Sequence, residues 1–81
     1  MSYTEVEKTV LRKLFYHRYI GARHTSIDNI PKGFPKHEYK RVKKALKRLM
    51  KEGFLIVKPT SYGIEVSLNP EKIEEIKKII E

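Results

Sequence analysis

Hydrophobic residues recur every three or four positions near the start of the chain, and this spacing predicts an amphipathic helix. The apolar face begins at Val6 and continues through Leu14. The segment Thr-Glu-Val-Glu that starts at Thr4 has the signature of a capping box, in which a threonine and a glutamate satisfy the first backbone amides. Gly21 is a typical helix stop. We therefore expect a helix from about residue 5 to residue 19.

The next segment contains several turn-forming residues and predicts short elements. Residues 23–25 can form one extended strand, and Ser26 can cap a brief helix over residues 27–30. Pro31 should limit that helix, because the residue before a proline disfavours the helical conformation. Residues 32–34 then predict a tight turn.

The central part of the chain predicts its longest helix, over residues 35–52. Pro35 suits the first helical position, where a missing amide hydrogen costs nothing. An apolar stripe at helical spacing includes Val42 and Leu49, and Gly53 marks the end.

The pattern then changes from helical to extended. Residues 54–58 form an apolar run, residues 59–63 a turn, and residues 64–68 alternate as a half-buried strand does. Asn69 and the proline after it predict the start of a last helix. Strands neither alternate with helices nor form a long run, so we expect an α+β fold in one domain over residues 1–81.

The net charge of +8 is concentrated in one part of the chain. Between Pro31 and Thr60 there are ten Lys and Arg residues and two Glu residues, whereas the rest of the chain has eight bases and eight acids. A solubilising surface usually mixes both signs. A segregated basic segment is typical of proteins that bind polyanions.

The bases of the 35–52 segment also share one side of the predicted helix, opposite the apolar stripe. Like charges four residues apart destabilise a helix by about 0.2–0.5 kcal/mol per pair. A partner made of phosphates would remove this cost and release counterions. The candidate contact residues on this segment are Lys36, His37, Lys40, Arg41, Lys43, Lys44, Lys47, Arg48 and Lys51.

The run from Val42 to Ile56 (VKKALKRLMKEGFLI) resembles the recognition helix and first wing strand of winged helix-turn-helix proteins. MarR-type regulators show the same V-x-x-A-L-x-x-L-x-x-x-G pattern followed by two apolar residues. The order of elements is also similar to that of small stand-alone archaeal winged-helix proteins. The resemblance implies a three-helix core, a two- to three-stranded β-wing and a C-terminal helix, and it implies a DNA-binding transcriptional regulator.

The resemblance implies roles for individual residues. The first half of the long helix would meet base edges in the major groove, with Arg41 best suited to guanine. Lys47, Arg48 and Lys51 would hold phosphates. The wing would contribute Lys58, Thr60, Ser61 and Tyr62, with Tyr62 exposed at its tip, although the turn lacks the Lys or Arg that many family members carry there. Before the short helix, a phosphate would be held by Arg23, His24, Thr25 and Ser26.

Other binding functions stay open at this point. The same charge would suit structured RNA, such as tRNA or the ribosome, and the same scaffold can serve as a protein-interaction module for an acidic partner. The first or the last helix could form a homodimer interface. A membrane surface is a poor partner, because the apolar face of the basic helix is needed for the core and the chain has no Trp.

Catalytic chemistry finds no support in the residues. There is no Cys, no Gly-rich phosphate loop and no zinc-protease or nucleophile-elbow motif. The three histidines, His17, His24 and His37, match no metal-binding spacing, so we expect no enzyme activity, no metal and no cofactor. We expect His17 at the edge of the core and Tyr39 inside it. The first residues have no signal-peptide character, and we expect a cytoplasmic protein.

Overall fold

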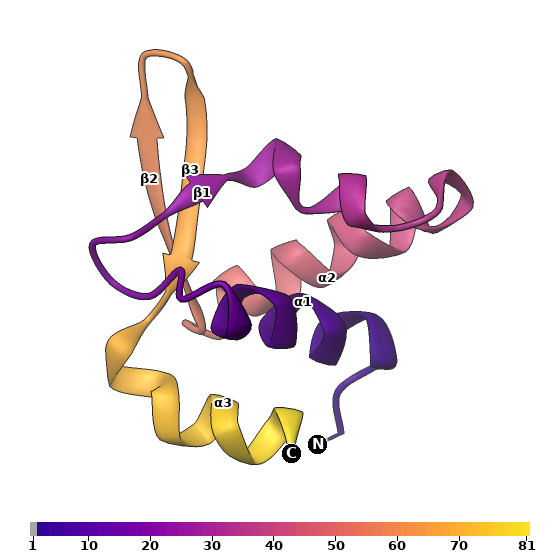
Figure 1. Cartoon of the computed structure of the whole chain (residues 1–81). Coiled ribbons are helices and arrows are strands. Elements are labelled where there is room, and N and C mark those ends of the chain that lie inside the picture. The colour runs from indigo at the N-terminus through magenta and orange to yellow at the C-terminus, as the bar shows by residue number, and fades with distance from the viewer. Residues whose placement is uncertain (1) are drawn as a thin grey trace.

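The α+β prediction is confirmed in the computed structural model, which describes residues 2–81. Its helices are α1 (Glu5–Tyr16), α2 (Tyr39–Lys51) and α3 (Ile73–Ile80), and its strands are β1 (Thr25–Ser26), β2 (Leu55–Thr60) and β3 (Gly63–Leu68). Short 3-10 turns fill the segment between β1 and α2, and another precedes α3. Figure 1 shows α1 in the middle of the molecule, with α3 on one side of it and the sheet and α2 on the other.

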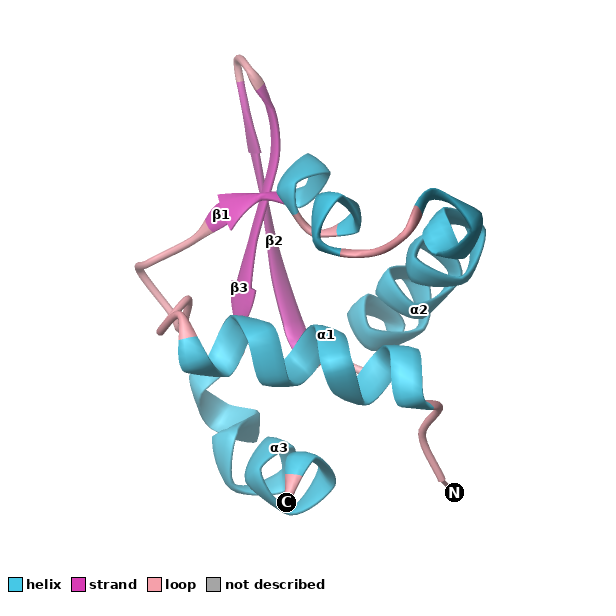
Figure 2. Ribbon diagram, turned by 45° about the vertical axis from the view of Figure 1, so that its right-hand side comes forward, coloured by secondary structure: helices cyan, strands magenta, loops and turns pink. Residues whose placement is uncertain are grey.

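The three strands form one antiparallel sheet in the order β1-β3-β2. β2 and β3 make a hairpin in which Thr60 pairs with Gly63, so that only Ser61 and Tyr62 lie in the turn. The far half of this hairpin projects beyond the helices in both views (Figures 1 and 2). Pro59 is tolerated in β2 because this is an edge strand.

The core lies where α1, α2, α3 and the base of the hairpin meet. Leu11, Leu49, Leu68 and Ile76 come from these four elements, and each is completely buried. Among residues 2–81, no helix is long and apolar enough to cross a bilayer.

The start of α1 was predicted correctly, but its end was not. Thr4 and Glu7 form the expected capping box, with each side chain accepting a hydrogen bond from the other residue's backbone amide. The helix ends at Tyr16 rather than near residue 19, because Arg18 adopts the left-handed conformation (φ 63°). The Arg18 amide donates to the Phe15 carbonyl, which closes the helix as a glycine usually does.

The expected short helix over residues 27–30 is only a 3-10 turn, Ile27–Asn29. Ser26 caps it as predicted, by accepting a hydrogen bond from the Asp28 amide. Pro31 does not end the helical conformation: Ile30 remains helical (φ −70°, ψ −50°), and a second 3-10 turn follows. The strand of this region lies at Thr25–Ser26, rather than at residues 23–25, because these two residues pair with β3.

The long helix is shorter than predicted at its start. Pro35 is extended (ψ 149°) and caps a 3-10 turn, Lys36–Glu38, before the α-helix begins at Tyr39. The end agrees with the prediction: Gly53 has φ 83°, and the Phe54 amide donates to the Leu49 carbonyl. This arrangement needs a left-handed residue at position 53, which explains the glycine.

The alternation predicted for the last strand ends before its C-terminus. Val66, Ser67 and Leu68 are all buried, because both faces of β3 are covered there. The Ser67 hydroxyl is satisfied by donating to the Gly21 carbonyl at 2.9 Å. Asn69 caps the turn before α3 as expected.

Candidate nucleic-acid interface

The apolar side of α2 is fixed by the core. Val42, Leu46 and Leu49 are at most 4% exposed, as the apolar stripe predicts. Since the side chains of a helix project at about 100° intervals, burial of this side forces the opposite side outward. The helix therefore presents its basic residues as a consequence of how it packs.

Five lysines occupy the outward side of α2, and we call them the lysine row. At about 100° per residue they fall within an arc of about 100°, and at about 1.5 Å per residue they extend over about 16 Å. All five residues are exposed. The lysine row consists of Lys40, Lys43, Lys44, Lys47 and Lys51.

The charge of the lysine row is not compensated within the part of the chain that the structure describes. The ion pairs found there involve other bases, and no acidic oxygen lies within 4.0 Å of these five ammonium groups. The acids of α3, Glu74 and Glu75, pair with Lys77 and Lys72. The row is thus a continuous cationic surface that is available to an external anion.

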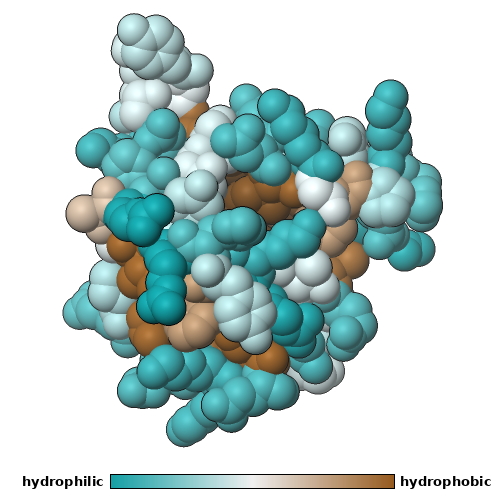
Figure 3. All heavy atoms as spheres, in the orientation of Figure 1, coloured by the Kyte–Doolittle hydropathy of each residue, from teal (hydrophilic) through white to brown (hydrophobic). Residues whose placement is uncertain are grey.

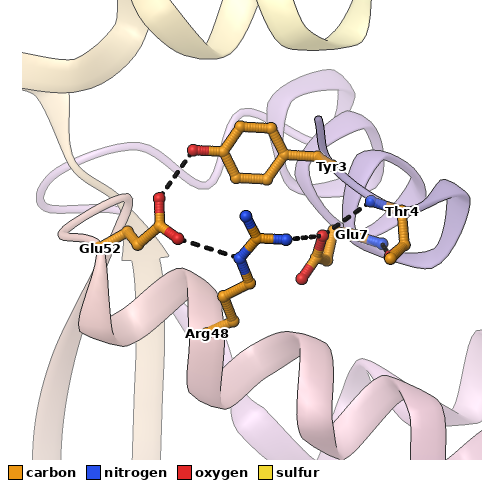
Figure 4. Close-up of polar contacts among 5 residues, drawn as sticks. All are labelled: Tyr3, Thr4, Glu7, Arg48 and Glu52. Atoms are coloured by element: carbon orange, nitrogen blue, oxygen red, sulfur yellow. Dashed lines mark hydrogen bonds and ion pairs between the residues drawn. The ribbon is translucent and has the colours of Figure 1, made fainter. Parts of the chain in front are cut away.

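Arg48 does not belong to this surface, although it was predicted to hold a phosphate. Its guanidinium points toward the start of α1, where Nη1 donates to Glu7 Oε1 at 2.9 Å and Nε donates to Glu52 Oε2 at 2.9 Å (Figure 4). It also lies over the ring of Tyr3, with 4.6 Å from Cζ to the ring centroid. Arg48 therefore joins α1 to α2 and is not free to bind a ligand.

Tyr3 and Glu52 complete this network. The Tyr3 hydroxyl donates to Glu52 Oε1 at 2.7 Å (Figure 4). The hydrogen bonds from Tyr3 and then from Arg48 lower the pKa of Glu52, while burial and the bond to Glu52 raise the pKa of Tyr3. The i,i+4 spacing of Arg48 and Glu52 is a signal that sequence reasoning could have used. Nothing in the sequence near Arg48 indicates that Tyr3 and Glu7 contact this network as well.

The other predicted bases near α2 have mixed surroundings. Arg41 is 76% exposed at its side chain, but its Nη1 lies 3.1 Å from Glu38 Oε1. Lys36 and His37 are exposed on the 3-10 turn before α2, so they do not continue the helical register of the lysine row.

The predicted hairpin contacts separate into exposed and occupied groups. Lys58, Ser61 and Tyr62 are exposed. The Thr60 hydroxyl is occupied, because it donates to the Gly63 carbonyl at 2.9 Å and accepts from the Tyr62 amide at 3.2 Å. Lys58 faces Glu65 across the hairpin, but Glu65 pairs with His24.

The predicted phosphate grip before the short helix lacks the helix that was expected beside it. The hydroxyl of Thr25 accepts from Asn29, and that of Ser26 accepts from the Asp28 amide. Arg23 is exposed, with its guanidinium 6.0 Å from the centroid of the Tyr19 ring. Because a 3-10 turn replaces the expected helix, this segment has little helix dipole to offer an anion.

Two further side-chain expectations need correction. His17 is exposed at the end of α1 and does not lie at the edge of the core, because the helix ends at that point. Tyr39 is only half-buried and is not among the residues that pack on the core.

Two hollows lie beside α1 on the side of α2 and the 3-10 turns. One of about 540 Å³ runs between the start of α1 and the Arg41–Arg48 flank of α2. The other, of about 250 Å³, lies between α1 and the 3-10 turns over an apolar floor that includes Leu14 and Ile30. The face drawn in Figure 3 shows a hollowed patch of hydrophobic atoms that is surrounded by hydrophilic ones. Neither hollow contains a cluster of three His, Asp or Glu side chains suited to a metal, nor does any other part of residues 2–81.

Of the predicted contact residues, the structure brings the five lysines of α2 together and leaves Lys58 and Tyr62 accessible on the hairpin. It turns Arg48 toward Glu7 and Glu52 and uses the hydroxyl hydrogen of Thr60, whereas the hydroxyls of Thr25 and Ser26 only accept hydrogen bonds and can still donate. No known protein family, curated protein or solved structure matches this chain.

Proposed function

We propose that this chain binds duplex DNA through the lysine row of α2. In this proposal the fold is a winged helix-turn-helix, with α2 as the recognition helix and the β2–β3 hairpin as the wing. The single observation that carries it is the uncompensated charge of five exposed lysines on one side of a helix whose other side is buried.

The dimensions of the row support a groove-binding role. The major groove of B-DNA is about 12 Å wide and admits an α-helix. A row about 16 Å long reaches the phosphates on both sides of such a groove. In A-form RNA the major groove is too deep and narrow for side chains to read, and this favours DNA as the partner of α2.

The row consists of lysines, so its main contribution is phosphate binding rather than base reading. Sequence discrimination would require Arg41, which holds Glu38 in the free protein. An exposed ion pair contributes only about 0.2–1 kcal/mol, so a guanine can displace Glu38 at small cost. A transcriptional regulator of this kind would bind many sequences and discriminate modestly among them.

The proposal is tested by titrating a short DNA duplex at several salt concentrations. Five phosphate contacts predict that log K falls with log salt with a slope of about −4.5. The double variant Lys43→Ala/Lys47→Ala should reduce the slope to about −2.7, because each lost contact removes about 0.9. Lys78→Ala is the matched control: Lys78 is also an exposed helical lysine, but it lies on α3. A salt-independent affinity, or equal effects of the row and control variants, would refute the proposal.

Competition and mass measurements separate the alternatives. An RNA binder would be displaced from DNA by structured RNA at equal salt, and a protein-interaction module would bind DNA weakly and without a defined stoichiometry. Light scattering with and without the duplex tests a homodimer, which would let two copies of α2 read two half-sites.

A further inference from the structure

The tip of the β2–β3 hairpin presents a single aromatic side chain to solvent. Tyr62 is 100% exposed, whereas the other exposed large hydrophobic residues range from 39% to 69%. The tip lies well away from the helices in both views (Figures 1 and 2). Tyr62 therefore contributes nothing to the core, and its position is free to serve a contact with another molecule.

The surroundings of Tyr62 are uncharged. The turn is completed by Thr60, Ser61 and Gly63, and the next cross-strand pair consists of Pro59 and Ile64, which is 44% exposed. Charge begins only at the following pair, Lys58 and Glu65. A positive charge would strengthen contacts between the tip and phosphates, whereas contacts with base faces need an aromatic or apolar group.

The turn is also held in place before any ligand arrives. The Thr60 hydroxyl bonds to the Gly63 carbonyl and to the Tyr62 amide, so the backbone on both sides of Tyr62 is fixed. Gly63 adopts φ 140°, which side-chain-bearing residues rarely reach. A preformed turn loses little conformational freedom on binding, so more of the contact energy is available for affinity.

We propose that Tyr62 stacks on an unpaired base next to a duplex, so that the chain prefers forked DNA ends to blunt ones. In a continuous duplex each base face is already stacked on its neighbours, and insertion of a side chain costs unstacking energy. At a fork the base face is accessible without that cost. The inference rests on the proposed function, because the lysine row would hold the paired part of the DNA while Tyr62 contacts the unpaired base.

The test compares two DNA ligands with the same strand lengths and the same number of phosphates. One is fully paired, and in the other the terminal pairs are mismatched to form a fork that carries 2-aminopurine at an unpaired position. Stacking on an aromatic residue strengthens binding by about 5- to 150-fold per base, so the wild-type chain should bind the fork at least about 5-fold more tightly and quench 2-aminopurine.

The variants locate the effect at the tip. Tyr62→Ala should abolish the quenching and bind the fork and the paired duplex with equal affinity, and Tyr62→Phe should keep both the fork preference and the quenching. Tyr16→Ala is the matched control, because Tyr16 is also an exposed tyrosine, 69% exposed, but lies on α1. Equal binding of fork and duplex by the wild type, or a preference that survives Tyr62→Ala, overturns this inference and leaves the lysine row standing. Salt-independent binding of both ligands refutes the proposed function and this inference together.

Discussion

Replacement of Glu7 by alanine should be among the most damaging single changes outside the apolar core. The Glu7 side chain is 5% exposed, and its Oε1 accepts two hydrogen bonds, from the Thr4 amide at 2.8 Å and from Arg48 Nη1 at 2.9 Å. Loss of a helix-capping bond costs about 0.5–1 kcal/mol, and loss of a hydrogen bond between charged groups costs about 1.5–3 kcal/mol. We expect Glu7→Ala to lower the free energy of unfolding by about 2–4 kcal/mol.

Urea denaturation followed by circular dichroism measures this loss, and thermal unfolding should show a fall in Tm of roughly 12–24 °C for a loss of about 3 kcal/mol. Glu7→Gln keeps an acceptor for the Thr4 amide but not the charge, so its loss should be about half as large. Glu5→Ala is the control, because Glu5 also lies in the first turn of α1 but its side chain is 84% exposed. It should change stability by no more than about 0.5 kcal/mol. If Glu7→Ala behaved like Glu5→Ala, the network in Figure 4 would not stabilise the fold.

Two other predictions follow from local geometry and from the shifted pKa values. Arg18→Gly should raise the free energy of unfolding by about 0.5–1 kcal/mol, because relief of the left-handed strain at Arg18 outweighs the larger chain entropy of glycine. A lower free energy of unfolding in urea denaturation would contradict this. Because the pKa of Glu52 is lowered, the contribution of Glu52 to stability is present above about pH 4.5 and is lost as the pH falls further. Because the pKa of Tyr3 is raised, the contribution of Tyr3 is present below pH 10 and is lost as the pH rises beyond it. Tyr3→Phe should therefore remove the alkaline loss and weaken the acid one, and an unchanged pH profile of Tm would refute this.

Residues close together in the sequence specified most of the secondary structure. The capping box at Thr4, the cap at Asn69 and the glycine that ends α2 were all predicted, because each depends on atoms only a few residues apart. The starts of the helices were less predictable where several weak signals competed, as between Pro35 and Tyr39. There the chain forms a 3-10 turn that no periodicity distinguishes from a helix.

The candidate site also has one part that local sequence predicted and one part that depends on a distant segment. Helical periodicity alone placed the lysine row opposite Val42 and Leu49, since an apolar stripe leaves the charged residues only one side of the helix. Periodicity could not exclude Arg48 from that surface. On α2 it lies on the flank toward α1, and its partner Glu7 is 41 residues away in the sequence.

The sequence by itself therefore determined the segregation of charge, the α+β class and the outward side of the basic helix. It also predicted that Tyr62 is exposed at the hairpin tip, as the structure confirms. Only the tertiary structure decided which bases are available to a ligand and that β3 becomes buried on both faces at Ser67. The reason is physical: periodicity reports the side of an element that avoids water, whereas the partner of a polar group depends on which distant segment packs beside it.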